Sequence, residues 1–259
     1  MTSDRRFPYW PLLREMTRSE ILLRDQGSLL GFLWTLLHPA LMFTVLYALF
    51  SKWVGKYVEQ YVAYLLVGIV LWNFFQKSTT YALGSFKRNR GTLMNYRFPR
   101  EIVVLSSVGA VVWSSAMETA VLLGALLLLG QPPRWGWLLL PAVFALELAM
   151  ATGTALFLAV LAAEYQDVER IWDVLSSAFF YLTPVFYPLS ILSPSKRRLM
   201  ELNPLAQILA ASRACIIGSP APSVTESAAV AAAGMLLVAA GLAVLRRRQF
   251  KIMDKLLAR

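Results

Sequence analysis

The sequence contains one cysteine, one histidine and few charged residues, and each scarcity excludes a class of protein. Cys215 cannot form a disulfide within the chain, and His38 cannot by itself build a metal site of several histidines. No Gly-x-x-x-x-Gly-Lys-[Ser/Thr] motif occurs, so the chain lacks the loop that binds nucleotide phosphates. A Gly-x-Ser-x-Gly motif is also missing, which argues against a hydrolytic enzyme.

Apolar residues dominate what is present. Hydrophobic residues make up 58% of the 259 residues, charged residues only 15%, and the mean hydropathy is +0.56. Six apolar stretches reach the ~20 residues that cross a ~30 Å hydrocarbon core. They cover residues 32–51, 61–81, 102–129, 135–162, 171–192 and 227–245. The sequence therefore predicts an all-α integral membrane protein with six transmembrane helices, in which residues 32–246 form the transmembrane domain.

Basic residues are concentrated at both ends and in alternate loops. Tyr9, Leu12, Leu13 and Met16 recur at near-helical spacing among charged residues, which predicts that residues 1–31 form an amphipathic helix at the membrane interface, with an ordinary polar leader as the alternative. Residues 247–259 form a basic tail. With the N-terminus in the cytoplasm, cytoplasmic segments hold most of the 25 Lys and Arg, so both termini are expected there. This topology accounts for the basic charge without a nucleic-acid partner.

The loop 84–100 combines basic residues with apolar and aromatic ones. Its candidate contact residues are Phe86, Lys87, Arg88, Arg90, Leu93, Met94, Tyr96 and Phe98. We expect a short helix that docks into the groove of a partner on the cytoplasmic side. A second interpretation is a basic loop at the lipid headgroups, which explains the charges but explains the apolar residues less well.

The segment 184–217 follows the fifth predicted span and is rich in proline. Proline interrupts the helix near the outer face, and the apolar run that follows is too short to span the membrane. We expect short re-entrant helices that dip into the outer leaflet, with an ordinary external loop as the alternative. The residues singled out are Pro184, Phe186, Tyr187, Pro188, Asn203 and Pro204.

Two carboxylates and one aromatic stripe lie within the predicted spans. Glu118 and Glu147 are placed at similar depth on neighbouring helices, without a basic residue in either span. They are equally compatible with a pair that carries protons and with hydrogen bonds between helices. Phe43, Tyr47 and Phe50 share one face of the first span, where aromatic rings could line a path for sugar rings or could simply pack.

An ordered set of short motifs resembles the membrane subunits of type-2 ABC exporters for polysaccharides such as O-antigen, capsule or teichoic acid. The set spans essentially the whole chain, but Gln166 and His38 stand where these families often have Arg and Asn. It consists of Arg24-Asp25-Gln26-Gly27-Ser28-Leu29-Leu30-Gly31-Phe32-Leu33-Trp34, Phe98-Pro99-Arg100-Glu101, Asp167-Val168, Thr183-Pro184-Val185, Asn203-Pro204-Leu205 and Arg213.

The resemblance implies a homodimer in the cytoplasmic (inner) membrane that works with two copies of a separate ABC ATPase. This chain would bind no cofactor, since ATP and Mg would lie on the ATPase, and the substrate would be a lipid-linked glycan. Residues 84–100 would be the coupling helix, Asp167 would begin a smaller contact, and residues 184–217 would be outer gate helices. Arg24 is a candidate for binding the lipid pyrophosphate, because arginine suits phosphate contacts. The alternative is that Arg24 only anchors the cytoplasmic flank of the first span through its positive charge.

Two alternatives to a polysaccharide exporter are retained. The first is a type-2 ABC permease for a drug or another small amphiphile, and the second is a proton-coupled carrier that uses Glu118 and Glu147. A membrane-embedded glycosyltransferase is disfavoured, because no loop carries an acidic cluster suited to a metal-bound nucleotide sugar.

Overall fold

The computed structural model describes residues 8–25 and 29–257, and every regular element in this part of the chain is a helix. The all-α prediction is thus confirmed. In chain order the elements are α1 (Tyr9–Asp25), α2 (Leu29–Val54), α3 (Tyr61–Leu83), α4 (Ser85–Arg88), α5 (Arg90–Asn95), α6 (Glu101–Leu128), η1 (Trp135–Leu139), α7 (Leu140–Glu164), α8 (Val168–Leu182), η2 (Leu189–Ile191), α9 (Pro194–Glu201), α10 (Pro204–Ile217) and α11 (Val224–Leu257).

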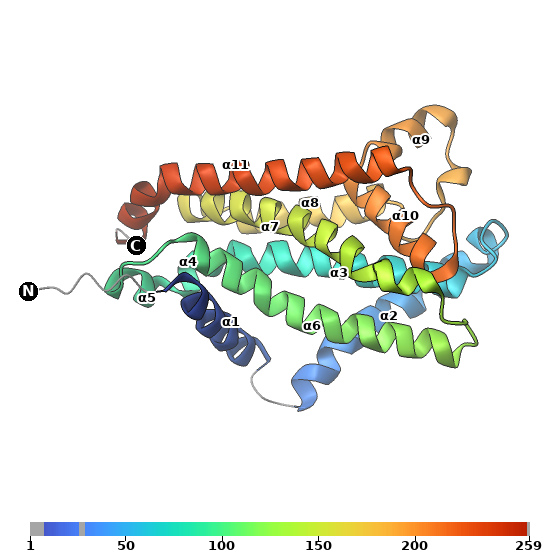
Figure 1. The fold of residues 1–259 in the computed structure, drawn as a ribbon, viewed down its shortest axis with the longest axis horizontal. Coiled ribbons are helices and arrows are strands. Elements are labelled where there is room, and N and C mark those ends of the chain that lie inside the picture. The colour runs from blue at the N-terminus through green and yellow to red at the C-terminus, as the bar shows by residue number, and fades with distance from the viewer. Residues whose placement is uncertain (1–7, 26–28, 258–259) are drawn as a thin grey trace, which may run out of the picture.

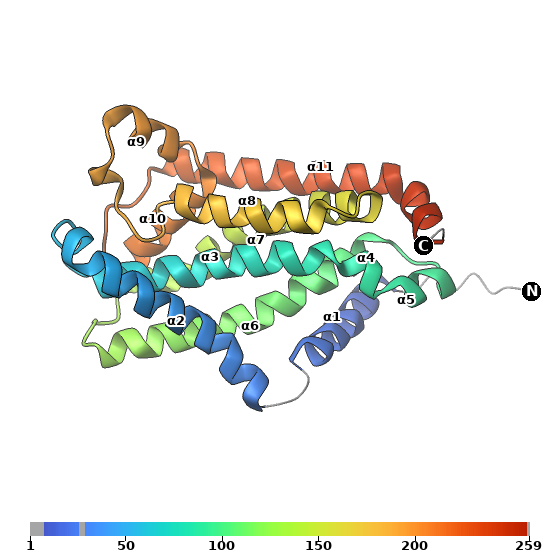
Figure 2. The ribbon, with the colours of Figure 1, turned by 180° about the vertical axis from the view of Figure 1, so that it is seen from behind.

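The long helices form an elongated bundle around α3. Helices α3, α6, α7, α8 and α11 run along its length, while α2 leans outward and α1 lies obliquely across one end (Figures 1 and 2). α3 packs on α6 and α7 and also contacts α2, α8 and α10. The end of the bundle that holds α1, α4 and α5 also holds the C-terminal end of α11, whereas α9 and α10 lie at the opposite end (Figure 1). We call these the α1 end and the α9 end.

Four of the described helices are long and apolar enough to cross a membrane, in the ranges Leu36–Val54, Glu101–Leu128, Trp135–Glu164 and Val224–Lys255. α3 has 23 residues but is less apolar, because its second half carries Asn73, Gln76 and Lys77.

The prediction of the fifth span over residues 171–192 is wrong in its extent. α8 has 15 residues and stops at Leu182, because Pro184 cannot continue a helix. It measures about 22 Å, which is less than a ~30 Å core. The count of six spans stays a prediction.

α7 and α11 approach closely along their length because glycines lie between them. A Cβ atom added at Gly153 would lie 2.6 Å from the Cβ of Leu237, and one at Gly241 would lie 2.8 Å from the Cβ of Leu156. Small residues allow helix backbones to approach, which increases van der Waals contact where lipid offers no hydrophobic driving force. The two helices therefore form one tightly packed unit.

The last turns of α11 are fixed to the end of α7 by charges. The Glu164 carboxylate lies 3.1 Å from Arg248 Nη1 and 3.2 Å from Lys251 Nζ, and Lys255 Nζ donates to the Glu164 carbonyl at 2.7 Å. The residues expected to form a separate basic tail continue α11 as far as Leu257. Residues 1–7, 26–28 and 258–259 of the predicted end segments lie outside the described part.

Candidate functional site

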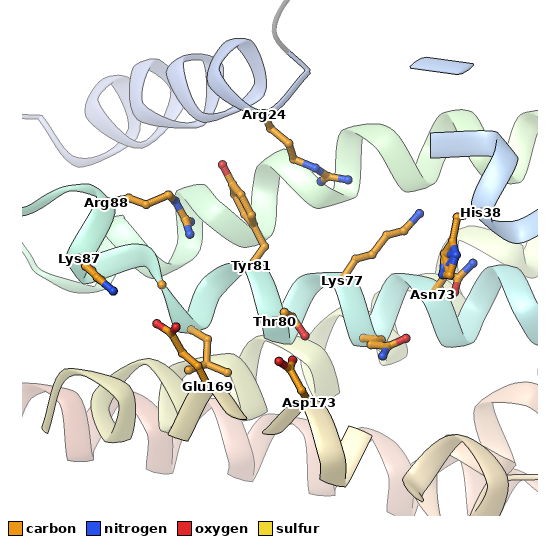
Figure 3. Close-up of a pocket in the computed structure, with 13 residues that line it drawn as sticks. Arg24, His38, Asn73, Lys77, Thr80, Tyr81, Lys87, Arg88, Glu169 and Asp173 are labelled. Atoms are coloured by element: carbon orange, nitrogen blue, oxygen red, sulfur yellow. The ribbon is translucent and has the colours of Figure 1, made fainter. Parts of the chain in front are cut away.

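A cavity of about 680 Å³ opens among α1, α2, α3, α4 and α8, toward the α1 end of the bundle (Figure 3). Its walls differ in charge, with cations on α1, α3 and α4 and carboxylates on α8. The lining side chains that carry polar groups are Arg24, His38, Asn73, Gln76, Lys77, Thr80, Tyr81, Lys87, Arg88, Glu169 and Asp173. Only Arg24, Lys87 and Arg88 of these had been predicted as site residues.

The two walls of this cavity are not joined by ion pairs. The carboxylates of Glu169 and Asp173 point from α8 toward α3 (Figure 3). In the described part of the chain, no Lys or Arg lies within 4.0 Å of either carboxylate. The cavity therefore separates charges of opposite sign across open space, where they can act on a charged ligand.

Arg24 is the lining cation best placed for an anion. It lies in the last turn of α1, and its guanidinium carbon is 5.6 Å from the ring centroid of Tyr81. One terminal nitrogen, Nη1, is buried and has no hydrogen-bond partner among the described residues. A buried donor without a partner is unfavourable, so a ligand acceptor here would gain a charge-assisted hydrogen bond.

Lys77 bears on the role of the buried glutamates, which the sequence analysis leaves open. Its Nζ lies 2.7 Å from Glu118 Oε1, so Glu118 has a basic partner on the neighbouring helix α3. Glu147 is also buried, and its Oε2 has no hydrogen-bond partner among the described residues. Because a cation already compensates Glu118, the like-charge pair required by the proton-carrier alternative is disfavoured.

The loop 84–100, which we call the coupling segment after its predicted role, folds as two short helices with a break at Asn89. Phe86 and Leu93 are only 2% and 1% exposed and pack against the chain's own core. The expectation that these two side chains face a partner is therefore wrong, and Met94 and Phe98 pack partly against the same cluster. The residues that a partner can reach include Lys87, Thr92, Tyr96 and Arg97, which are exposed.

The coupling segment and the α7–α8 link share a second cavity, of about 600 Å³. Phe86, Lys87 and Arg90 line one side, the link contributes Gln166 and Asp167, and the first turn of α8 contributes Glu169 and Arg170. Asp167 and the coupling segment, predicted separately from sequence, thus lie side by side. Lys87 and Glu169 line both this cavity and the first one.

At the α9 end, residues 183–188 connect α8 to η2 without helical structure, and we call this segment the chain break after α8. Side chains from other helices hold it in place. Four successive carbonyls accept hydrogen bonds: those of Pro184 and Val185 from Arg213, that of Phe186 from Tyr61, and that of Tyr187 from Tyr64. The donor distances are 2.9, 2.6, 3.0 and 3.0 Å in the same order. Backbone that leaves a helix in an apolar environment needs such partners.

The short helices predicted for the segment 184–217 are present as η2, α9 and α10, after the break at Thr183. Asn203 starts α10, where its side chain accepts from Leu205 N at 3.0 Å and donates to Thr183 Oγ1 at 3.2 Å. Pro204 occupies the first turn of this helix. Pro188 and Tyr187 are partly buried, and burial together with the nearby Tyr64 hydroxyl raises the pKa of the Tyr187 phenol. That phenol stays protonated and donates to the last carbonyls of α8.

The aromatic residues of α2 join rings from α3 and from the chain break. Phe43 stacks on Tyr47 at 5.5 Å between ring centroids, and Tyr47 stacks on Tyr61 at 6.2 Å. Phe50 packs instead against Phe186, at 4.8 Å. Tyr47 is 39% exposed, so part of this row lies outside the core.

Comparison with protein families matches residues 11–217 to the ABC-2 type transporter family. Among curated proteins, the chain is 26% identical over 245 residues to the O-antigen export system permease protein RfbA of Myxococcus xanthus, covering 94% of each chain. It is 25% identical over 199 residues to RfbA of Klebsiella pneumoniae, covering 76% of this chain and 77% of the relative. A capsule polysaccharide export inner-membrane protein, CtrC of Neisseria meningitidis serogroup A, is 22% identical over 241 residues, covering 88% and 87%.

Proposed function

The chain belongs to the ABC-2 type transporter family, and from this membership we propose that it is the membrane-spanning subunit of an ATP-driven polysaccharide exporter. Relatives that match most of its length are named for the export of O-antigen and capsule polysaccharide. We further propose that the α1 end faces the cytoplasm of the inner membrane, with both termini on that side. The substrate is a glycan joined by pyrophosphate to a lipid carrier.

A separate ABC ATPase supplies the energy in this proposal, because the sequence has no loop for nucleotide phosphates. The docking surface consists of the exposed part of the coupling segment and the link around Asp167, which together line the cavity of about 600 Å³. ATP and Mg would be bound by that partner. This chain would respond to their binding through its coupling segment.

A second copy of the chain covers the free face of α8. Only the stripe Trp172, Ser176 and Phe180 of that helix is buried, while Ile171, Val174 and Phe179 are exposed. Glu169 and Asp173 point instead toward α3 and line the cavity of about 680 Å³ (Figure 3). A homodimer in which the two α8 helices lie near each other would cover the exposed apolar side chains.

The observation that carries the proposal is the position of Arg24 in the cavity of about 680 Å³. Lys77 and Arg88 are held by Glu118 and Glu20, which leaves Arg24 and Lys87 as the lining cations without an ion pair in the described residues. A pyrophosphate matches this pair in charge and in hydrogen-bond acceptors. The stacked row of Phe43 and Tyr47 offers ring faces for sugars farther along.

Replacement of Arg24 tests this function in cells that depend on the gene for surface polysaccharide. We expect Arg24→Ala to lower the polysaccharide at the cell surface about ten-fold, since one charge-assisted hydrogen bond contributes ~1.5–3 kcal/mol. Arg18→Ala is the matched control, because Arg18 is exposed on the same helix. Full export by Arg24→Ala, at a normal level of protein in the membrane, would exclude the phosphate role.

The ATPase contact is tested separately by copurification. Because Phe86 and Leu93 are buried, charges introduced there would damage the core and would not report on docking. Lys87→Glu combined with Arg97→Glu changes only exposed positions, and we expect it to reduce recovery of the ATPase subunit. Unchanged recovery would remove the coupling segment from the interface.

A further inference from the structure

We propose that Glu20 is a positioning residue that links the coupling segment to the cavity wall, so that a movement of that segment is passed to Arg24. This inference rests on the proposed function, because it concerns how the ATPase-facing part of the chain acts on the part that meets the substrate. Glu20 lies on α1, which was predicted only as an interfacial helix.

Glu20 has three polar partners although it is only 2% exposed. Its Oε1 accepts from Asn89 Nδ2 at 2.7 Å, and its Oε2 accepts from the Tyr81 hydroxyl at 2.6 Å. Arg88 Nε forms an ion pair with the same Oε2 at 3.6 Å. Tyr81 lies near the end of α3, Arg88 is the last residue of α4, and Asn89 forms the break before α5. The Glu20 carboxylate on α1 thus binds the coupling segment at the break between α4 and α5.

A carboxylate is not needed to attach α1 to the bundle. α1 already packs along α6, with Met16 buried and Thr17 3.0 Å from the position of a Cβ added at Gly109. Burying a carboxylate carries a large desolvation cost that only well-placed donors offset. The network of Glu20 therefore provides a specific connection that apolar packing would not provide.

Tyr81 connects this network to the cavity. Its hydroxyl donates to Glu20, and its ring lies near two guanidinium groups, with Arg88 at 3.8 Å and Arg24 at 5.6 Å from the ring centroid. Arg24 follows Glu20 by four residues, which places both on one face of α1. Glu20, Tyr81 and both arginines are therefore joined in one contiguous cluster.

The cluster constrains how the coupling segment can move. Arg88 also donates to Ser107 Oγ on α6 at 3.1 Å, so the end of α4 is held from two sides. If the partner ATPase shifts α4 and α5, the short hydrogen bonds at Glu20 either break or move α1. Moving α1 changes the position of Arg24 in the cavity. Packed hydrogen-bond networks with discrete arrangements are the physical means by which distant sites become coupled.

The test compares Glu20→Gln with Glu15→Gln in the complex purified with its ATPase subunit. Glu15 is exposed on the same helix and serves as the matched control. Glutamine keeps the shape of the side chain but turns one acceptor into a donor, which faces either Asn89 at the Oε1 position or Tyr81 and Arg88 at the Oε2 position. We expect Glu20→Gln to keep the ATPase subunit and its basal ATP hydrolysis, while ATP-dependent export of the glycan in vesicles falls about ten-fold, as for coupling of ordinary strength.

A second variant keeps the test decisive if Glu20→Gln disturbs folding. Asn89→Ala removes the amide that donates to Glu20 Oε1 and to the Ser85 carbonyl, but it keeps the contacts of Glu20 with Tyr81 and Arg88. It should lower export with hydrolysis retained. Where Glu20→Gln assembles, export by the double variant Glu20→Gln/Asn89→Ala should be no lower than export by the more impaired single variant, because effects of residues in one network are not additive. Export by Glu20→Gln at the Glu15→Gln level would overturn the inference, as would equal export and hydrolysis losses in Asn89→Ala. Absence of ATP-dependent export in the wild type and in Glu15→Gln would instead contradict the proposed function.

Discussion

Arg213 lies over the ring of Tyr64, with its guanidinium carbon 3.4 Å from the ring centroid. The same guanidinium donates to the carbonyls of Pro184 and Val185, and its exposed fraction is 4%. No carboxylate lies within ion-pair distance of Arg213 in the described ranges. The buried cation of Arg213 is thus stabilised by backbone carbonyl oxygens and by the face of the Tyr64 ring. Its hydrogen bonds also fix the chain break, the non-helical segment after α8 at the α9 end.

Replacing Arg213 should loosen this break. We expect Arg213→Ala to lower the free energy of unfolding in detergent by about 3 kcal/mol, because carbonyls lose charge-assisted partners. Arg213→Lys should be intermediate, since an ammonium group cannot donate in a fork and stack at once. Cys215 is the chain's single thiol and is 8% exposed, so maleimide labelling reports the loosening directly. Arg198→Ala, at an exposed position, should leave both measurements unchanged.

Gly68 provides an independent test of the same region. A Cβ atom at this position would lie 2.4 Å from the Val185 carbonyl oxygen and 2.7 Å from Arg213 Nη2. Gly68→Ala should therefore displace the break and reduce stability by about 2 kcal/mol, as expected for overpacking. Gly124→Ala is the control, because nothing lies within 4 Å of its added Cβ. Equal melting temperatures for the two variants would contradict the close approach.

The Lys77–Glu118 pair should show strong coupling between its members. Lys77→Met leaves a buried carboxylate without its cation, and we expect a loss of about 3 kcal/mol in the free energy of unfolding. The double variant Lys77→Met/Glu118→Gln should recover at least half of that loss, because no uncompensated charge remains. Chemical unfolding of the single and double variants gives the interaction energy. If the loss in free energy of unfolding of the double variant equals the sum of the losses of the two single variants, the pairing is refuted.

Removing the carboxylate of Glu164 should free the end of α11 without unfolding the bundle. Arg248 and Lys251 are each about half exposed, so their ion pairs contribute less than about 1 kcal/mol. We expect Glu164→Gln to leave the melting temperature nearly unchanged but to speed trypsin cleavage around Arg248. High salt should produce the same acceleration in the wild type, since it screens exposed charges. Identical cleavage rates in both proteins at low salt would argue against this clamp.

The lengths of the apolar stretches in the sequence alone predict much of the architecture. The apolar stretches that include residues 102–129, 135–162 and 227–245 correspond to helices, because a run of this length has few other stable states in a membrane. The extent of α8 was overestimated, since the apolar character of the sequence continues past Leu182 while the helix does not. Pro184 indicates where the helix ends, but hydropathy does not indicate which side chains stabilise the backbone there.

The site was harder to predict, because its pairs join residues far apart in the chain. Lys77 with Glu118 and Tyr81 with Glu20 are contacts between helices that a single sequence does not reveal. The coupling segment illustrates a second limit. Alternating apolar and basic residues show that one face is apolar, yet they do not tell whether that face meets a partner or the chain's own core. Phe86 and Leu93 meet the core.

The glycine contacts between α7 and α11 also bear on how the protein is made. α11 follows the other described helices in the chain, so the ribosome makes it after them. Until it inserts, the small-residue surface around Gly153 and the carboxylate of Glu164 lack their partners. Translation that stops before α11 therefore yields an incomplete bundle, which we expect membrane proteases to remove.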